Sequence, residues 1–230
     1  QVVIQNDAID DRIWALTYGG SMLLTALVSP LAGAAADERC WKKRFLIGSG
    51  LMCGIFTCGL GLIQPGQMWL AILLYVPANF AFSIGENFLA SFLPGLAKQD
   101  EVGRVSGFSW ACAYAAALLL LIVTAGAMVL LKMESADCWR PFFVFAGLWF
   151  LVFTIPTMLW LHEPQVARVI HPGRNLLTAG FVRLAETLRD TARYKDLAIL
   201  LVASLFYGTG MSVVVFFASK LAVEYGFQQV

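Results

Sequence analysis

Charge is scarce in this sequence. Of its 230 residues only 13% are charged and the formal net charge is +1, whereas 59% are hydrophobic. So few charges cannot cover the apolar side chains of a water-soluble protein of this size, and we therefore expect lipid to be the solvent. The near-neutral balance also argues against a nucleic-acid-binding protein, which would need a basic surface.

Cysteine and histidine are sparse as well. The five cysteines show neither C-x-x-C nor histidine-paired spacing, so they are most simply packing residues or free thiols. We expect no metal site and no cofactor. A set of nucleophile, base and orienting group cannot be assembled from the sequence either, and we expect a protein that is not an enzyme.

Long apolar stretches are abundant instead. Each has about the 20 residues that a helix needs to cross the hydrocarbon core of a membrane. They predict six transmembrane helices near residues 13–36, 45–64, 68–93, 105–131, 142–161 and 197–219. The expected fold class is all-α, a polytopic membrane helix bundle. Because the chain starts with Gln1 and ends soon after an apolar stretch, we also expect further residues at both ends.

The distribution of Lys and Arg predicts the orientation of this bundle. Segments 37–44, 94–104 and 162–196 hold 12 of the 16 basic residues, so these three loops should be cytoplasmic. Within the last of them, apolar residues at helical spacing predict an amphipathic helix over 176–195, with Phe181, Leu184 and Leu188 against the membrane surface. A charged helix that merely packs under the bundle fits this pattern equally well.

Glu86 is the only charged residue that lies well inside an apolar stretch. A carboxylate in lipid costs a few kcal/mol or more, so such a residue normally faces a bundle interior or a wet cavity. Helical spacing places Asn79, Ser83 and Glu86 on one stripe, with Asn87 beside it. This stripe predicts a cavity wall that binds a substrate or a coupling ion. The alternative is that Glu86 is permanently hydrogen-bonded to a neighbouring helix or to a basic group outside these residues.

Two other stretches have weaker polar stripes. One contains Tyr18, Ser21, Thr25 and Ser29, and the other includes Ser204 and Tyr207. Hydroxyl groups in membrane spans usually bond to their own helix or to a neighbour, so we expect a packing role for most of these residues. The small residues Gly107, Ala111 and Ala115 have the four-residue spacing that lets two helices approach closely.

The loop GAAADERCWKKR joins the first two stretches. Gly33 should allow a close helix contact and Asp37 should cap the following helix. The basic residues Arg39, Lys42, Lys43 and Arg44 should hold the loop on the cytoplasmic side. A Gly-x-x-x-Asp pattern followed by a basic cluster resembles the signature loop of the major facilitator superfamily, and the resemblance implies that this loop takes part in gating.

Three longer blocks narrow this resemblance. SPLAGAAADERCWKKRFL, ENFLASFLPGLAKQDEVGRVSGFSWACAYAAALLLL and GFVRLAETLRDTARYKDLAILLVASLFYGTGMSVV are similar, in order and spacing, to the vacuole-effluxer-like branch of that superfamily. Its members include the autophagy-related vacuolar amino-acid exporter and many bacterial relatives. The chain departs from the usual pattern at Glu38, where a basic residue is usual, at Cys40, where Gly is common, and at Tyr207-Gly208-Thr209-Gly210, where an acidic residue often precedes a glycine.

The resemblance implies a major-facilitator-like bundle in which these spans are helices two to seven of twelve. Residues 1–162 would form helices two to six of the amino-terminal bundle, 163–196 the central cytoplasmic loop, and 197–230 the first helix of the carboxy-terminal bundle. In that fold the fourth and seventh helices line the central cavity. Asn79, Ser83, Glu86, Ser204 and Tyr207 would then lie near a shared path.

The expected function is secondary active transport of a small polar solute by alternating access, with amino acids as one candidate substrate class and a proton as one candidate coupling ion. The alternative is a non-transporting membrane scaffold or assembly subunit that keeps the fold and has a membrane-complex partner. Both readings expect an integral protein of a bacterial inner membrane or an organelle membrane. Its contacts would be the lipid bilayer and the missing flanking helices of the same chain.

Overall fold

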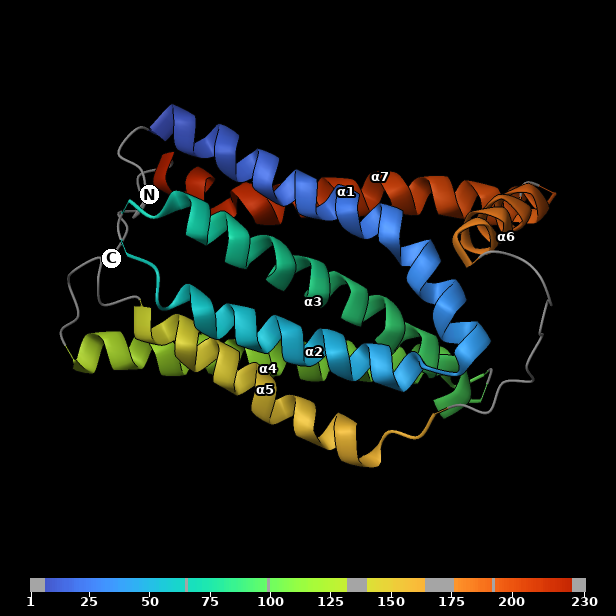
Figure 1. Ribbon diagram of the computed structural model, residues 1–230, viewed down its shortest axis with the longest axis horizontal. Helices are drawn as coiled ribbons and strands as arrows, with labels where there is room; N and C mark the ends of the chain where they lie inside the picture. The colour runs from blue at the N-terminus through green and yellow to red at the C-terminus, as the bar shows by residue number, and fades with distance from the viewer. Residues whose placement is uncertain are drawn as a thin grey trace. The chain divides into compact units, whose positions relative to one another are not determined.

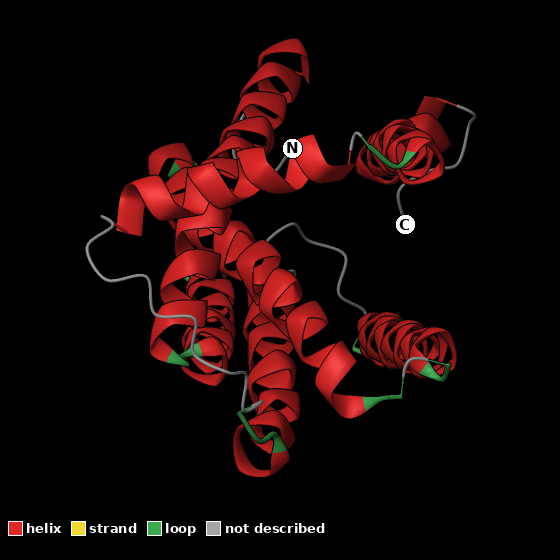
Figure 2. Ribbon diagram, turned by 90° about the vertical axis from the view of Figure 1, so that its right-hand side faces the viewer, coloured by secondary structure: helices red, strands yellow, loops and turns green. Residues whose placement is uncertain are grey.

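The computed structural model describes residues 7–64, 66–98, 100–131, 140–163, 176–191 and 193–224. Within these ranges the secondary structure is helical, without strands (Figure 2). The helices are α1 (Asp7–Arg39), α2 (Lys42–Leu60), α3 (Met68–Leu96), α4 (Val102–Leu130), α5 (Arg140–Trp160), α6 (Leu176–Thr191) and α7 (Lys195–Glu224). The predicted all-α fold class is confirmed, and each of the six apolar stretches overlaps one helix.

Five helices, α1, α3, α4, α5 and α7, are long and apolar enough to cross a membrane. The sequence predicted six, and α2 is the difference. Its 19 residues begin with Lys42, Lys43 and Arg44, and it ends at Leu60 instead of continuing to residue 64. The apolar part of α2 is therefore shorter than the sequence interpretation assumed.

Pro94 does not end α3, although we expected the helix to stop at residue 93. The helix continues to Leu96, and the amide of Ala97 still donates to the carbonyl oxygen of Leu93 at 3.2 Å. Proline removes one backbone donor but is tolerated in membrane helices where the freed groups find other partners.

The chain forms two compact units, Gln1–Gly180 and Phe181–Val230. In the first unit, α2 packs against α3 and α5 along most of its length (Figure 1). Small residues make the α2–α5 contact close: a Cβ atom added at Gly54 would lie 2.5 Å from the side chain of Leu151, and one at Gly147 would lie 2.8 Å from the backbone of Cys58. Gly50 and Gly54 have the four-residue spacing that brings membrane helices together.

The core of this unit lies where the second half of α1 meets α3. Ala32 and Ala36 of α1 are buried against Ile84 and Phe88 of α3, and Phe45 of α2 stacks on Phe88 with ring centroids 5.2 Å apart. Alanine on one side and aromatic rings on the other allow the helices to pack closely.

α4 contributes no buried residue among those the structure describes. The close helix contact predicted for Gly107, Ala111 and Ala115 is wrong for the described part of the chain, because these positions are exposed and no atom lies within 4 Å of a Cβ added at Gly107. Small residues permit a close approach but do not select the partner helix.

The predicted amphipathic helix over 176–195 is present as α6, but it ends at Thr191 and α7 begins at Lys195. Phe181 and Leu184 are 45% and 44% exposed, and the side chain of Leu188 lies outside the described residues. Docking of this helix on a membrane surface stays a prediction. Positions 164–175 and 192 of the predicted central loop are also outside the described residues.

Candidate functional site

Asn79 is engaged in a contact between helices. Its Nδ2 donates to the Oγ of Ser21 on α1 at 2.6 Å, and Ser21 in turn donates to the carbonyl oxygen of Tyr18 at 2.7 Å. Ser21 is fully buried. The hydroxyl of Ser21 therefore satisfies both its donor and an acceptor position, and the packing role expected for the α1 stripe is confirmed here.

Asn87 makes a second contact of the same kind two helical turns further on. Its Nδ2 donates to the Oγ of Ser29 at 3.2 Å, and both bonds join residues 58 positions apart. Equal separation means that α1 and α3 run parallel and in register along this edge. Two of the four residues that the sequence predicted for the α3 site thus hold α1 in place.

Glu86 lies beside this contact but has no partner in it. Its side chain is exposed and forms no hydrogen bond or ion pair with any residue that the structure describes. Ser83 is half-buried. The buried residues of α3, Ala78, Ala81, Ile84, Phe88 and Phe92, lie on the side of the helix roughly opposite the polar stripe. Glu86 and Ser83 therefore belong to a side of α3 that the packing of these residues against α1 and α2 leaves open.

Ser204 and Tyr207 lie on α7, in the second compact unit. Both are exposed, Tyr207 at 72%. In the next turn, Thr209 and Ser212 donate their hydroxyl hydrogens to carbonyl oxygens four residues earlier on the same helix, at 2.7 and 2.9 Å. These two hydroxyl groups are satisfied within α7, as polar residues in membrane helices often are.

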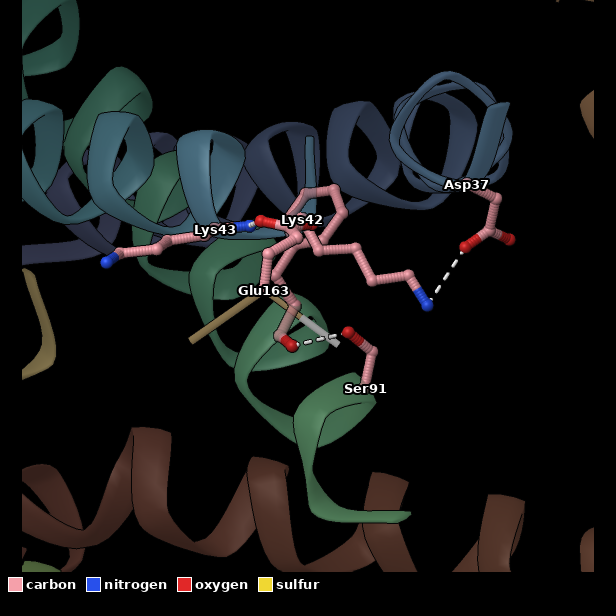
Figure 3. A network of polar contacts seen from close by, with 6 residues as sticks. Asp37, Lys42, Lys43, Ser91 and Glu163 are labelled. Atoms are coloured by element: carbon pink, nitrogen blue, oxygen red, sulfur yellow. Dashed lines mark hydrogen bonds and ion pairs between the residues drawn. The ribbon is translucent and has the colours of Figure 1, made fainter. Parts of the chain in front are cut away.

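Two residues of the predicted gating loop contact each other where α1 meets α2. Lys42 forms an ion pair with Asp37, with 3.0 Å between Nζ and Oδ1 (Figure 3). A gating role for this segment stays a prediction. Asp37 lies within α1 and is not the N-cap residue of α2; that position is occupied by Trp41, whose side chain forms no capping hydrogen bond. The expected close contact at Gly33 is also wrong for the described residues, because a Cβ added there would have open space around it.

Glu163 caps α2 instead, from 120 residues further along the chain. Its Oε2 accepts a hydrogen bond from the backbone amide of Lys43 at 2.8 Å (Figure 3). A carboxylate at a helix N-terminus satisfies a free amide and interacts favourably with the helix dipole. The sequence interpretation missed this residue; the available signal was an acidic residue directly after the apolar stretch of α5, in His162-Glu163-Pro164.

Cys40 adopts a backbone conformation that normally belongs to glycine. Its φ is +53°, and the amide of the next residue, Trp41, donates to the carbonyl oxygen of Ala36 at 3.0 Å. This is the arrangement of a Schellman motif, in which a left-handed residue ends a helix. Glycine is common at this position in the family that the sequence resembles. The positive φ explains this preference, because glycine adopts it without a clash of a Cβ atom.

No group of three or more His, Cys, Asp or Glu side chains suited to a metal ion occurs in the described ranges. The candidate site has three parts. They are the hydrogen-bonded contact between α1 and α3, the carboxylate of Glu86 beside it, and the charged segment 37–44, to which Glu163 is hydrogen-bonded. These parts provide polar groups that can bind a polar solute and one carboxylate that can take up a proton.

Comparison with known proteins supplies the family. The family described as "Vacuole effluxer Atg22 like" matches residues 11–225. The chain is similar to the uncharacterized MFS-type transporter YxiO of Bacillus subtilis, with 25% identity over 217 residues that cover 91% of this chain and 50% of the relative. It is also similar to autophagy-related protein 22 of Pichia angusta, with 28% identity over 191 residues that cover 71% of this chain and 34% of the relative.

Autophagy-related protein 22 of Saccharomyces cerevisiae gives the same picture, with 25% identity over 201 residues, 71% of this chain and 38% of the relative. The chain thus spans half or less of the length of these curated relatives. No solved structure matches. Five membrane-length helices and this match along nearly the whole chain identify an integral membrane protein. The chain belongs to the vacuole effluxer Atg22 like family.

Proposed function

We propose that this chain is part of a secondary active transporter that moves a small polar solute, with amino acids as the first class to test, by alternating access. The names of its relatives, an MFS-type transporter and members of a vacuole effluxer family, support membrane transport. In this proposal the α1–α3 edge is a fixed wall of the cavity. The halves of the bundle rock around the site and expose it to each side of the membrane in turn.

The observation that supports the proposal most directly is that the side chain of Glu86 has no bonding partner among the described residues. Both asparagines beside it are bonded to α1, whereas Glu86 has no partner in the described residues and lies on the open side of α3. An ionised carboxylate cannot remain in contact with hydrocarbon without water or a cation. Glu86 would therefore face a wet cavity, where it binds a substrate ammonium group or a proton. Ser83 lies beside it, and Ser204 and Tyr207 would line the other half of the path.

The substitution Glu86→Gln tests this role, because it keeps the shape of the side chain and removes its charge. Proton-driven uptake of a panel of radiolabelled amino acids into proteoliposomes should fall about tenfold to 100-fold, the effect of losing one hydrogen bond to a charged group. Glu101→Gln is the matched control. It removes the same charge from an exposed position just before α4 and should transport like the wild type.

Two further readouts separate the possible roles of Glu86. If it exchanges a proton, Glu86→Gln should lose proton-driven uptake and keep substrate exchange; if it binds an ammonium group, substrate affinity should fall in both assays. Wild-type uptake with an unchanged pH dependence, at matched protein levels, would contradict the proposal. It would favour the scaffold reading instead.

In this transporter the basic loops would lie on the cytoplasmic side of the membrane. The α1–α2 loop, the α3–α4 loop and the end of α5 lie at one end of the first unit (Figure 1). A hydrogen bond there joins Lys43, in the first turn of α2, to Glu163, just after α5. The basic residues of these segments favour the cytoplasmic side of a bacterial inner membrane or an organelle membrane.

A further inference from the structure

Two arginines lie against the same tryptophan ring in the α1–α2 loop. The Cζ atom of Arg39 is 4.8 Å from the centroid of the Trp41 ring, and that of Arg44 is 5.4 Å from it. Both arginines are exposed, and Trp41 is half-buried. The loop itself is only Cys40 and Trp41, so the position of the ring is fixed by the ends of α1 and α2. Two like charges are thus held at one aromatic ring.

The charges of this segment are not balanced. Residues 37–44 contain four basic and two acidic side chains, a net charge of +2. Asp37 is paired with Lys42, and neither Arg39 nor Arg44 lies within ion-pair distance of a carboxylate in the described part of the chain. Two guanidinium groups near one ring repel each other, and an anion bound to both would offset that repulsion. Their planar donor forks suit the oxygen atoms of a phosphate.

The place of this cluster in the fold selects the source of the phosphate. α1 is long and apolar enough to span a membrane, and Arg39 is its last residue. Tryptophan and arginine at such a helix end normally lie at the level of the lipid headgroups. The basic loops are expected on the cytoplasmic side, where anionic lipids are concentrated. We propose that Arg39, Trp41 and Arg44 form a binding site for the phosphate of an anionic phospholipid headgroup.

Lipid retention by the full protein in detergent micelles tests this site. Native mass spectrometry would compare the binding of phosphatidylglycerol and phosphatidylcholine to the wild type and to Arg39→Gln/Arg44→Gln. Loss of the charge-assisted hydrogen bonds from both arginines to the phosphate should weaken phosphatidylglycerol binding by about 100-fold. Lys98→Gln, which removes a charge from the α3–α4 loop at the same end, should lose no more than about fivefold, the general attraction of one basic residue near a membrane surface.

A charge-conserving variant distinguishes a specific site from general attraction. Arg39→Lys/Arg44→Lys keeps both charges but loses the planar fork and its stacking on Trp41, so phosphatidylglycerol binding should still fall several-fold. Equal affinity of the wild type for the two lipids, or an equal loss in Lys98→Gln, would overturn the proposal. Competition by soluble glycerol 3-phosphate as effective as that by the lipid would overturn the assignment to a lipid. The thermal unfolding midpoint of each variant checks that the fold is intact.

Discussion

A single methyl group at Gly147 should force α2 and α5 apart. The Cβ atom of Gly147→Ala would lie 2.5 Å from the Sγ of Cys58, which can rotate away. It would also lie 2.8 Å from the backbone nitrogen of Cys58 and 2.8 Å from the carbonyl oxygen of Gly54, which cannot. The α2 backbone has to move from 2.8 Å to the 3.4 Å at which ordinary contact begins, about 0.6 Å.

The magnitude follows from two opposing effects. Overpacking a tight interface costs about 1–3 kcal/mol, and alanine favours a helix over glycine by up to about 1 kcal/mol. With the full propensity gain the net destabilisation should be up to about 2 kcal/mol, about thirtyfold in the unfolding equilibrium constant, and it should be about 1–3 kcal/mol relative to a glycine-to-alanine change at an open helix position. The weak contact between the Sγ of Cys58 and the carbonyl oxygen of Val144, at 3.6 Å, should be lost as well.

Unfolding in mixed micelles with an increasing fraction of sodium dodecyl sulfate provides the assay, followed by the fluorescence of the chain's tryptophans, among them Trp149 on α5. Gly107→Ala on α4 is the matched control, because nothing lies within 4 Å of the added atom. It should be neutral or up to about 1 kcal/mol stabilising. A Gly147→Ala protein as stable as Gly107→Ala would refute the interpretation of the α2–α5 contact.

Three other predictions concern the charged end of the bundle. Cys40→Gly should stabilise the protein by about 1 kcal/mol in the same unfolding assay because glycine adopts a φ of +53° without a Cβ clash, and Cys40→Ala should show no such gain. Glu163→Gln should destabilise α2 by about 0.5–1 kcal/mol at low salt, and a difference that persists in high salt would contradict the dipole argument. The topology can be tested with single cysteines in a cysteine-free background. A cysteine at position 98 should react with an impermeant thiol reagent only from the cytoplasmic side, and one at position 66 only from the opposite side. Labelling of both positions from one side would rule out the topology.

The helices were predictable because a membrane span needs a continuous apolar stretch of known length, and that length can be read without tertiary information. Their ends were less predictable. Pro94 suggested a stop that α3 does not make, and α2 ends at Leu60, four residues before the predicted end of its apolar stretch. Both errors arose where neighbouring structure determines whether a backbone group finds a partner.

The candidate site was predictable only in part. The spacing of Asn79, Ser83 and Glu86 correctly placed them on one side of α3, but a single sequence does not say which serine on another helix an asparagine will meet. The cap from Glu163 joins residues 120 positions apart and depends entirely on the fold. The left-handed Cys40 was hidden for a different reason, since a cysteine carries none of the conformational preference that makes glycine informative.

The equal offset of the two α1–α3 hydrogen bonds limits how these helices can move. If α1 slid along α3 by one turn, about 5.4 Å, the bonds of Asn79 and Asn87 would break together, at a cost of about 1 kcal/mol beyond the disruption of the alanine and phenylalanine contacts. A tilt of both helices as one body breaks neither bond. The position of Glu86 along the axis of α1 is therefore constant while these two bonds hold. Any change in the access of Glu86 to water then has to come from other helices that move relative to the α1–α3 pair.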